Sequence, residues 1–151
     1  MVVLSTGARR RALAARRCVV LPVTDDTIRV FLHVLAATVW VGGQLTLAGL
    51  VPGLRSLGED APRTVARRFN RIAWPAFAVL VATGIWNVLV LEPDWDSDYG
   101  VTVMVKVLVV TLSGISAAVH SAARSKAALA AFGALSGVTA LGALFLGVQL
   151  G

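Results

Sequence analysis

Residues 72–91 read IAWPAFAVLVATGIWNVLVL, an apolar stretch interrupted by the polar side chains of Thr83 and Asn87. A helix needs about 20 apolar residues to cross the hydrocarbon core of a bilayer, so this stretch is long enough to span a membrane. With three similar stretches, the predicted spans lie at about 27–53, 69–91, 101–123 and 127–150. Backbone groups in lipid must bond internally, and these runs are too long for barrel strands, so each span is expected to be a helix. We therefore predict an all-α fold, an integral membrane four-helix bundle.

The chain is expected to divide into a polar basic tail, 1–24, and a transmembrane domain, 25–151. The apolar run from Cys18 to Val23 is too short for a secretory core, so we expect no cleaved signal peptide. Two interpretations of the tail stay open: a membrane-surface segment, or an extension that arises from an upstream start codon. The single cysteine excludes an internal disulfide and a cysteine-based zinc or iron–sulfur site.

Charge separates the two ends of the predicted bundle. Loop 92–100 is acidic, whereas seven basic residues lie around the other two loops. Because basic loops stay in the cytoplasm, we expect loops 54–68 and 124–126 to be cytoplasmic and loop 92–100 to lie outside, in a cell (inner) membrane. Five arginines in the tail favour the opposite orientation. Basic residues at helix ends account for the positive net charge, so no nucleic-acid partner is expected. The seven basic residues around loops 54–68 and 124–126 are Arg55, Arg63, Arg67, Arg68, Arg71, Arg124 and Lys126.

Ionisable residues inside a span are costly and are candidates for function. His33 lies about six residues into the first span and Lys106 about five into the third, so counting at ~1.5 Å per residue places them at similar depth. Asn87 and Gln149 lie near the same end, and Trp40 shares a helical face with His33. These five residues predict one polar layer, with His33 as candidate metal ligand. Two simpler interpretations are a buried neutral His33 and a Lys106 that reaches the acidic loop.

His120 is the third ionisable residue well inside a span. It lies fourteen residues beyond Lys106, or ~21 Å along a helix, so it cannot share a metal ion or a haem with His33 in one chain. Near Arg124 it is expected to meet lipid headgroups. No catalytic constellation or phosphate-binding glycine loop is present in the sequence, which does not favour an enzyme.

Small residues line the third and fourth spans, with Gly133 and Gly137 spaced for close helix approach. Two uses stay open: packing of the third and fourth spans within one chain, or association as a homodimer or in a larger membrane complex. The lipid bilayer is the other expected partner.

The order of several elements resembles a known family. His33 is followed by Trp40, Gly42 and Gly43, then by Thr83-Gly84-Ile85-Trp86, Tyr99-Gly100 and Lys106. This order resembles the CopD-like copper-resistance membrane domain over most of residues 28–125. The resemblance implies copper uptake or tolerance in the inner membrane, with His33 and Trp40 matching the first-helix motif and Lys106 the third-helix lysine. Classical members have about twice as many helices, and here histidine and methionine are scarce.

The same elements show a weaker similarity to the HemJ family of four-helix haem-binding membrane proteins. That similarity implies haem b as a cofactor, with His33 as an axial ligand and Lys106 near a propionate. Val105 stands where that family's pattern has a histidine. Three hypotheses therefore remain: copper or metal handling or transport centred on His33, a haem-binding redox protein, and a non-catalytic accessory subunit of a membrane complex.

Overall fold

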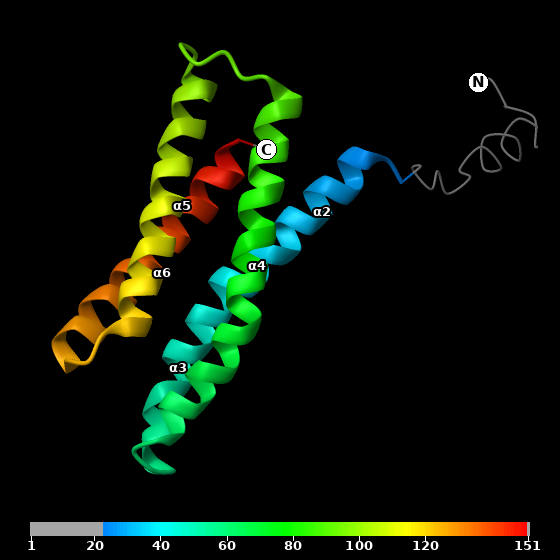
Figure 1. The fold of residues 1–151 in the computed structure, drawn as a ribbon. Helices are drawn as coiled ribbons and strands as arrows, with labels where there is room; N and C mark the ends of the chain where they lie inside the picture. Colours follow the sequence, from blue (N-terminus) through cyan, green and yellow to red (C-terminus); the bar gives the residue numbers. More distant parts are fainter. Residues whose placement is uncertain (1–22, 151) are drawn as a thin grey trace, which may run out of the picture.

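A computed structural model describes residues 23–150 and contains four helical spans in this part of the chain (Figure 1). The first span is continuous and consists of α2 (Asp25–Ala37), the π-helical turn η1 (Thr38–Gly42) and α3 (Gly43–Ser56). The others are α4 (Ala61–Leu91), α5 (Asp98–Ala122) and α6 (Lys126–Gln149). Each is long and apolar enough to cross a membrane, which confirms the all-α, four-helix membrane fold. Residues 1–22, and with them most of the predicted basic tail, lie outside the described residues.

Side-chain caps explain where three of the helices begin. The hydroxyls of Thr24, Ser97 and Ser125 each accept a hydrogen bond from the backbone N–H three residues later. Such caps satisfy N–H groups that have no partner within the helix. α4 instead begins with Pro62 in its first turn, where a proline is tolerated because that N–H would be unpaired in any case.

Two predicted boundaries, the end of the first span and the start of the second, are wrong. The loop predicted at 54–68 is reduced to residues 57–60, because α3 continues to Ser56 and α4 already begins at Ala61. The basic residues from Arg63 onward therefore lie on a helix that extends beyond its apolar part, since arginine is a good helix former. Pro75 lies inside α4, not near a helix end.

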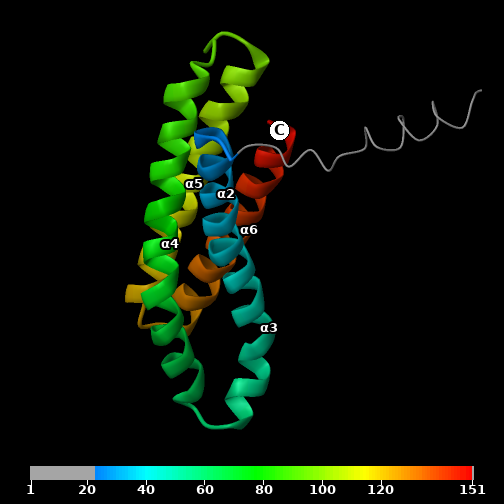
Figure 2. The same cartoon turned by 90° about the vertical axis from the view of Figure 1, so that its right-hand side faces the viewer.

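The spans form two pairs that diverge toward one end of the molecule (Figures 1 and 2). α4 lies along α2 and α3, and α5 pairs with α6, the most extensive helix contact among the described residues. The small core lies where the pairs meet and contains Ala36, Trp40, Ala73, Leu80 and Ala140. Trp40 packs on Phe77 and Trp74, with ring centroids 4.4 and 5.7 Å apart.

Between α3 and α6 lies a groove of about 290 Å³, called here the α3–α6 groove. Its α6 side contains small residues, and a side chain at Gly137 would meet no atom within 4 Å. The lining residues are Val41, Gln44, Leu45, Ala48, Gly133, Ala134, Gly137, Val138 and Leu141.

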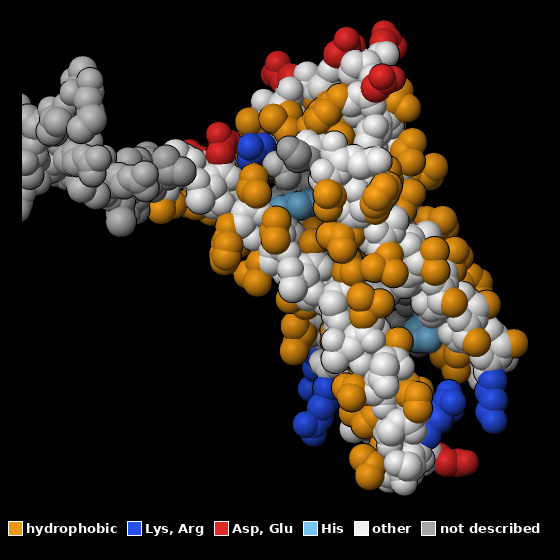
Figure 3. Space-filling view, turned by 180° about the vertical axis from the view of Figure 1, so that it is seen from behind, with side chains coloured by type: hydrophobic (Ala, Val, Ile, Leu, Met, Phe, Trp, Pro, Cys, Tyr) orange, Lys and Arg blue, Asp and Glu red, His pale blue; other side chains and the backbone are white. Residues whose placement is uncertain are grey.

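Most large apolar side chains of the four spans face outward, as expected where lipid is the solvent. Figure 3 shows a belt of hydrophobic side chains between an end rich in acidic residues and an end rich in basic ones. We call these the acidic end, with the α4–α5 loop 92–97, and the basic end, with loops 57–60 and 123–125. The protein is a multi-pass membrane protein.

Candidate functional site

His33 faces α4 and is held there by a hydrogen bond. Its Nδ1 lies 2.9 Å from the hydroxyl of Thr83, while that hydroxyl lies 2.7 Å from the carbonyl oxygen of Val79. The Thr83 hydroxyl has one proton to donate, so when it donates to Val79 it accepts from His33. In that tautomer of the neutral ring, Nδ1 carries the proton and Nε2 keeps its lone pair.

Gly84 gives the His33 ring its place on α4. A methyl group at Gly84 would lie 3.5 Å from His33 Cε1, in ordinary van der Waals contact, and a larger side chain would meet the ring. The Thr83-Gly84 pair noted in the sequence thus acts on His33 through both of its residues: one bonds the ring and the other leaves room for it.

Lys106 lies on α5 and is half-buried against α6. A methyl group at Gly147 would lie 3.2 Å from the Lys106 Nζ, so the glycine leaves space for the ammonium. In the described part of the chain Lys106 forms no ion pair.

Asn87 and Gln149 do not bond to these groups within residues 23–150. Asn87 is half-buried one turn beyond Thr83 on α4, and Gln149 is exposed as the last residue of α6. Their predicted place in the polar layer stays a prediction.

Trp40 lies two turns from His33 and belongs to a separate buried network. Its indole Nε1 donates to Ser113 Oγ at 3.2 Å, and Ser113 Oγ donates to the carbonyl of Ser136 at 3.1 Å. Ser136 Oγ in turn lies 3.1 Å from Gln44 Oε1 and 3.1 Å from the carbonyl of Ser113. These four residues join the first, third and fourth spans near the middle of the bundle.

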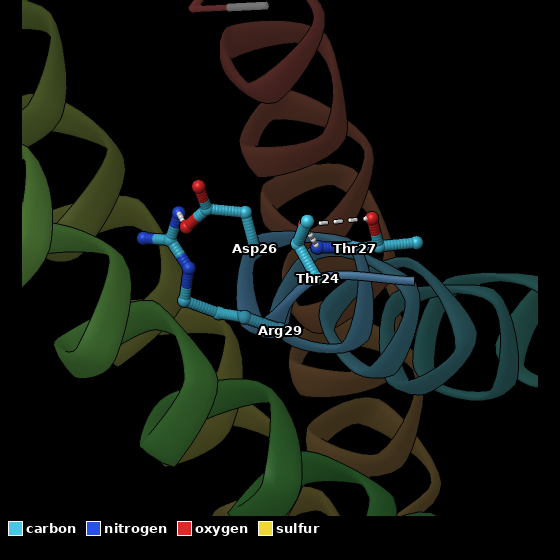
Figure 4. A network of polar contacts seen from close by, with 4 residues as sticks. All are labelled: Thr24, Asp26, Thr27 and Arg29. Carbon is cyan, nitrogen blue, oxygen red and sulfur yellow. Dashed lines mark hydrogen bonds and ion pairs between the residues drawn. The ribbon is translucent and has the colours of Figure 1, made fainter. Parts of the chain in front are cut away.

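Arg29 is the ionisable residue that sequence reasoning missed. It lies on α2 four residues before His33, hence on the same helical face, and is only 4% exposed. Its Nη2 donates to Asp26 Oδ1 at 2.8 Å, the one ion pair among the described residues (Figure 4). The spacing of four to His33 is the signal that could have found it.

His120 has a structural place at the basic end. Its Nδ1 lies 2.8 Å from the carbonyl of Leu129, and its ring packs against Gly133, so it closes the turn between α5 and α6. The ring bonds the backbone of its own chain, whereas an interfacial position among headgroups was expected.

Arg29 and His33 thus lie on one face of α2 and Lys106 lies on α5, all three toward the acidic end. Such a layer can offer a nitrogen ligand to a soft metal ion and N–H donors to an anion. Within residues 23–150 no group of three or more histidine, cysteine, aspartate or glutamate side chains could hold a metal ion.

Comparison with known proteins supports the family resemblance over the second, third and fourth spans and does not extend to the His33–Trp40 motif of the first span. Residues 63–149, more than half of the chain, match the family described as CopD, copper resistance protein D. No curated protein and no solved structure matches the chain. The matched segment contains α5 and α6, most of α4, and the site residues Thr83 and Lys106. The chain therefore belongs to the CopD family of membrane proteins.

Proposed function

We propose that this CopD-family protein handles copper within the membrane and that the imidazole of His33 holds the ion. The family match supports the metal. The hydrogen bond from His33 Nδ1 to Thr83 supports the ligand, and it is the observation on which the proposal depends. A histidine that ligates a metal usually donates its other ring N–H to an oxygen, which fixes the tautomer and the direction of the free nitrogen.

A single fixed ligand suits transfer of an ion more than its storage. Imidazole is a competent copper ligand, but one imidazole gives weak binding, and water, Asn87, Gln149 or a second chain must complete the coordination. Weak binding is an advantage in a transport protein, because an ion that enters the membrane must also leave its site. The proposed role is therefore copper passage or delivery, and not a tight copper store.

The proposed orientation places the acidic end outside the cell and the basic end in the cytoplasm of an inner membrane. Arg124 in loop 123–125 and the basic residues on the adjoining parts of α3, α4 and α6 support this orientation through the positive-inside rule. Copper would then meet His33 from the outer side, about two turns into the first span.

The two histidines of the chain provide a matched test. Purified, metal-stripped protein is titrated with cuprous ion against a chromophoric chelator, as wild type, His33→Ala and His120→Ala. We expect His33→Ala to lose the chelator-competing binding and His120→Ala to retain it, because His120 bonds Leu129 at the other end of the bundle. Equal binding by wild type and His33→Ala would refute the role of His33.

Haem binding is the second candidate function, and one observation favours it. Arg29 on α2 and Lys106 on α5 supply two cations in the same part of the bundle as the His33 imidazole, the set of groups that haem propionates and haem iron would require. The α3–α6 groove and the hollow beside Thr24 are both lined by other residues than His33, so neither is a haem pocket built on that ligand. A visible spectrum of the purified protein after haem addition tests this candidate, and absence of a Soret band would exclude it.

A further inference from the structure

Arg29 has more hydrogen-bonding capacity than its surroundings use. Asp26 takes one donor on Nη2, while Nε and Nη1 are buried and have no partner among residues 23–150. Figure 4 shows the side chain extending from α2 toward α4, with Asp26 beside one side of the guanidinium. Buried donors without acceptors are costly, and more so when they carry charge.

The carboxylate of Asp26 neutralises the positive charge of Arg29 poorly. Its side chain is 72% exposed, so water screens the pair, and it contacts Arg29 through a single oxygen. Nε and Nη2 form one straight edge of the guanidinium, which can bind two oxygens of one group at once. Asp26 accepts a hydrogen bond only from Nη2, and the buried Nε has no partner among residues 23–150.

Lys106 is a second cation in this part of the bundle. The Trp40–Ser113 hydrogen bond sets the register of the first and third spans, and counting seven residues back on each helix brings His33 level with Lys106. Arg29 lies about one turn, or ~6 Å, closer to the acidic end. In the described part of the chain neither Arg29 Nε nor the Lys106 ammonium contacts a carboxylate.

A hollow of about 410 Å³ opens beside Asp26 and gives access from the acidic end. It is lined by Thr24, Asp25, Asp26, Trp86 and Val90. Because Asp26 is exposed, its carboxylate can turn outward without breaking a packed contact. Arg29 does not itself line the hollow, so a group bound there would reach the guanidinium through the place that the Asp26 carboxylate now takes.

We propose that Arg29 and Lys106 form an oxyanion-binding site beside His33, which takes a phosphate or carboxylate group in place of Asp26. The two oxygens of the anion bind the Nε–Nη2 edge, and the Lys106 ammonium supplies the second positive charge. The site does not depend on copper. If copper binds His33, the anion supplies negative charge that no cluster of acidic ligands provides in residues 23–150.

Thermal unfolding of the full chain in a phosphate-free maltoside detergent, without copper, tests the site. Inorganic phosphate is the probe, and chloride at equal ionic strength is the control. At phosphate about 100-fold above the Kd we expect the Tm of wild type to rise by roughly 5 °C. This rise in Tm should persist in Lys126→Gln, which removes a basic residue at the other end of the bundle. It should shrink in Lys106→Gln and vanish in Arg29→Gln.

The Asp26→Asn variant controls for the possibility that Arg29→Gln loses phosphate binding because it misfolds. Removing the competing carboxylate should lower the Kd for phosphate several-fold, a gain that a misfolded protein cannot show. The same rise in Arg29→Gln as in wild type, or an unchanged Kd in Asp26→Asn, would overturn the proposal.

Measurements in a lipid bilayer distinguish two sources of the oxyanion, a lipid headgroup and a free anion. In nanodiscs of phosphatidylcholine and phosphatidylglycerol, loss of the effect of added phosphate assigns the site to a lipid headgroup. Persistence of that effect assigns it to a free anion. Because copper is absent throughout, phosphate binding with failed copper titrations would remove only the proposed copper function, and the reverse result would remove only the anion site.

Discussion

At the scale of single residues, the state of the His33 ring depends on Thr83. Thr83→Val keeps the shape of the side chain but removes the acceptor for Nδ1–H, so a partly buried donor is left unpaired. We expect a loss of about 1–3 kcal/mol in unfolding free energy and of about 10–100-fold in copper affinity. Thr83→Ser keeps the hydroxyl and should restore most of both. Denaturant unfolding followed by circular dichroism and copper titration measure the two quantities; a Thr83→Val protein equal to wild type in both would show that this hydrogen bond does not orient the ring.

His33 and Lys106 could be recognised from the sequence because a charged or polar group in an apolar run stands out and carries a cost. Arg29 was missed because it lies only five residues into α2, where a long basic side chain usually reaches the interface. Thr83 was seen only as part of a polar pair. Its bond to His33 depends on the rotation of α2 against α4, which helical spacing within one span cannot give.

At the scale of elements, the spans were predictable and the π-helical turn was not. Hydropathy locates a span within a few residues, but η1 inserts one residue into a helix without changing its composition. Thr38 and Thr46 donate to carbonyls four residues earlier, at either side of this turn, a pattern that bends helices. The turn places Trp40 against Ser113, and α3 then diverges from α6 beyond it.

Gly133 and Gly137, two of the four glycines of α6, distinguish packing within the chain from association with a partner. A Cβ atom at Gly133 would lie 3.0 Å from the His120 ring, whereas one at Gly137 would meet nothing. Gly133→Leu should therefore cost about 1–3 kcal/mol in unfolding free energy, because it overpacks the α5–α6 contact.

Gly137→Leu should leave unfolding within about 0.5 kcal/mol of wild type, as substitutions at open sites do. If the α3–α6 groove receives a helix of a second copy or of a larger complex, the same variant should lose that association in cross-linking within native membranes. Intact association in Gly137→Leu would leave the groove as a lipid-facing surface.

At the scale of the whole molecule, charge and hydropathy are arranged along one axis. Acidic residues gather at one end and basic residues at the other, and the spans between them are covered with apolar side chains (Figure 3). The sequence predicts this polarity well because it depends on composition alone. The arrangement of the two helix pairs could not be predicted, since the place where they meet depends on single contacts such as Gly114 of α5 against Phe77 of α4.

The sidedness of this axis is decided by two opposing sets of basic residues. Seven lie at the basic end and five in the tail 1–24, and the seven adjoin the apolar parts of the spans, where their effect on topology is strongest. In a Cys18→Ser background, Asp96→Cys and Glu59→Cys each place one thiol in an exposed loop, at the acidic and basic ends respectively. A membrane-impermeant maleimide added to intact cells should label Asp96→Cys at once and Glu59→Cys only after permeabilisation. The reverse pattern would mean that the tail determines the orientation, and His33 and the Arg29–Lys106 site would then open toward the cytoplasm.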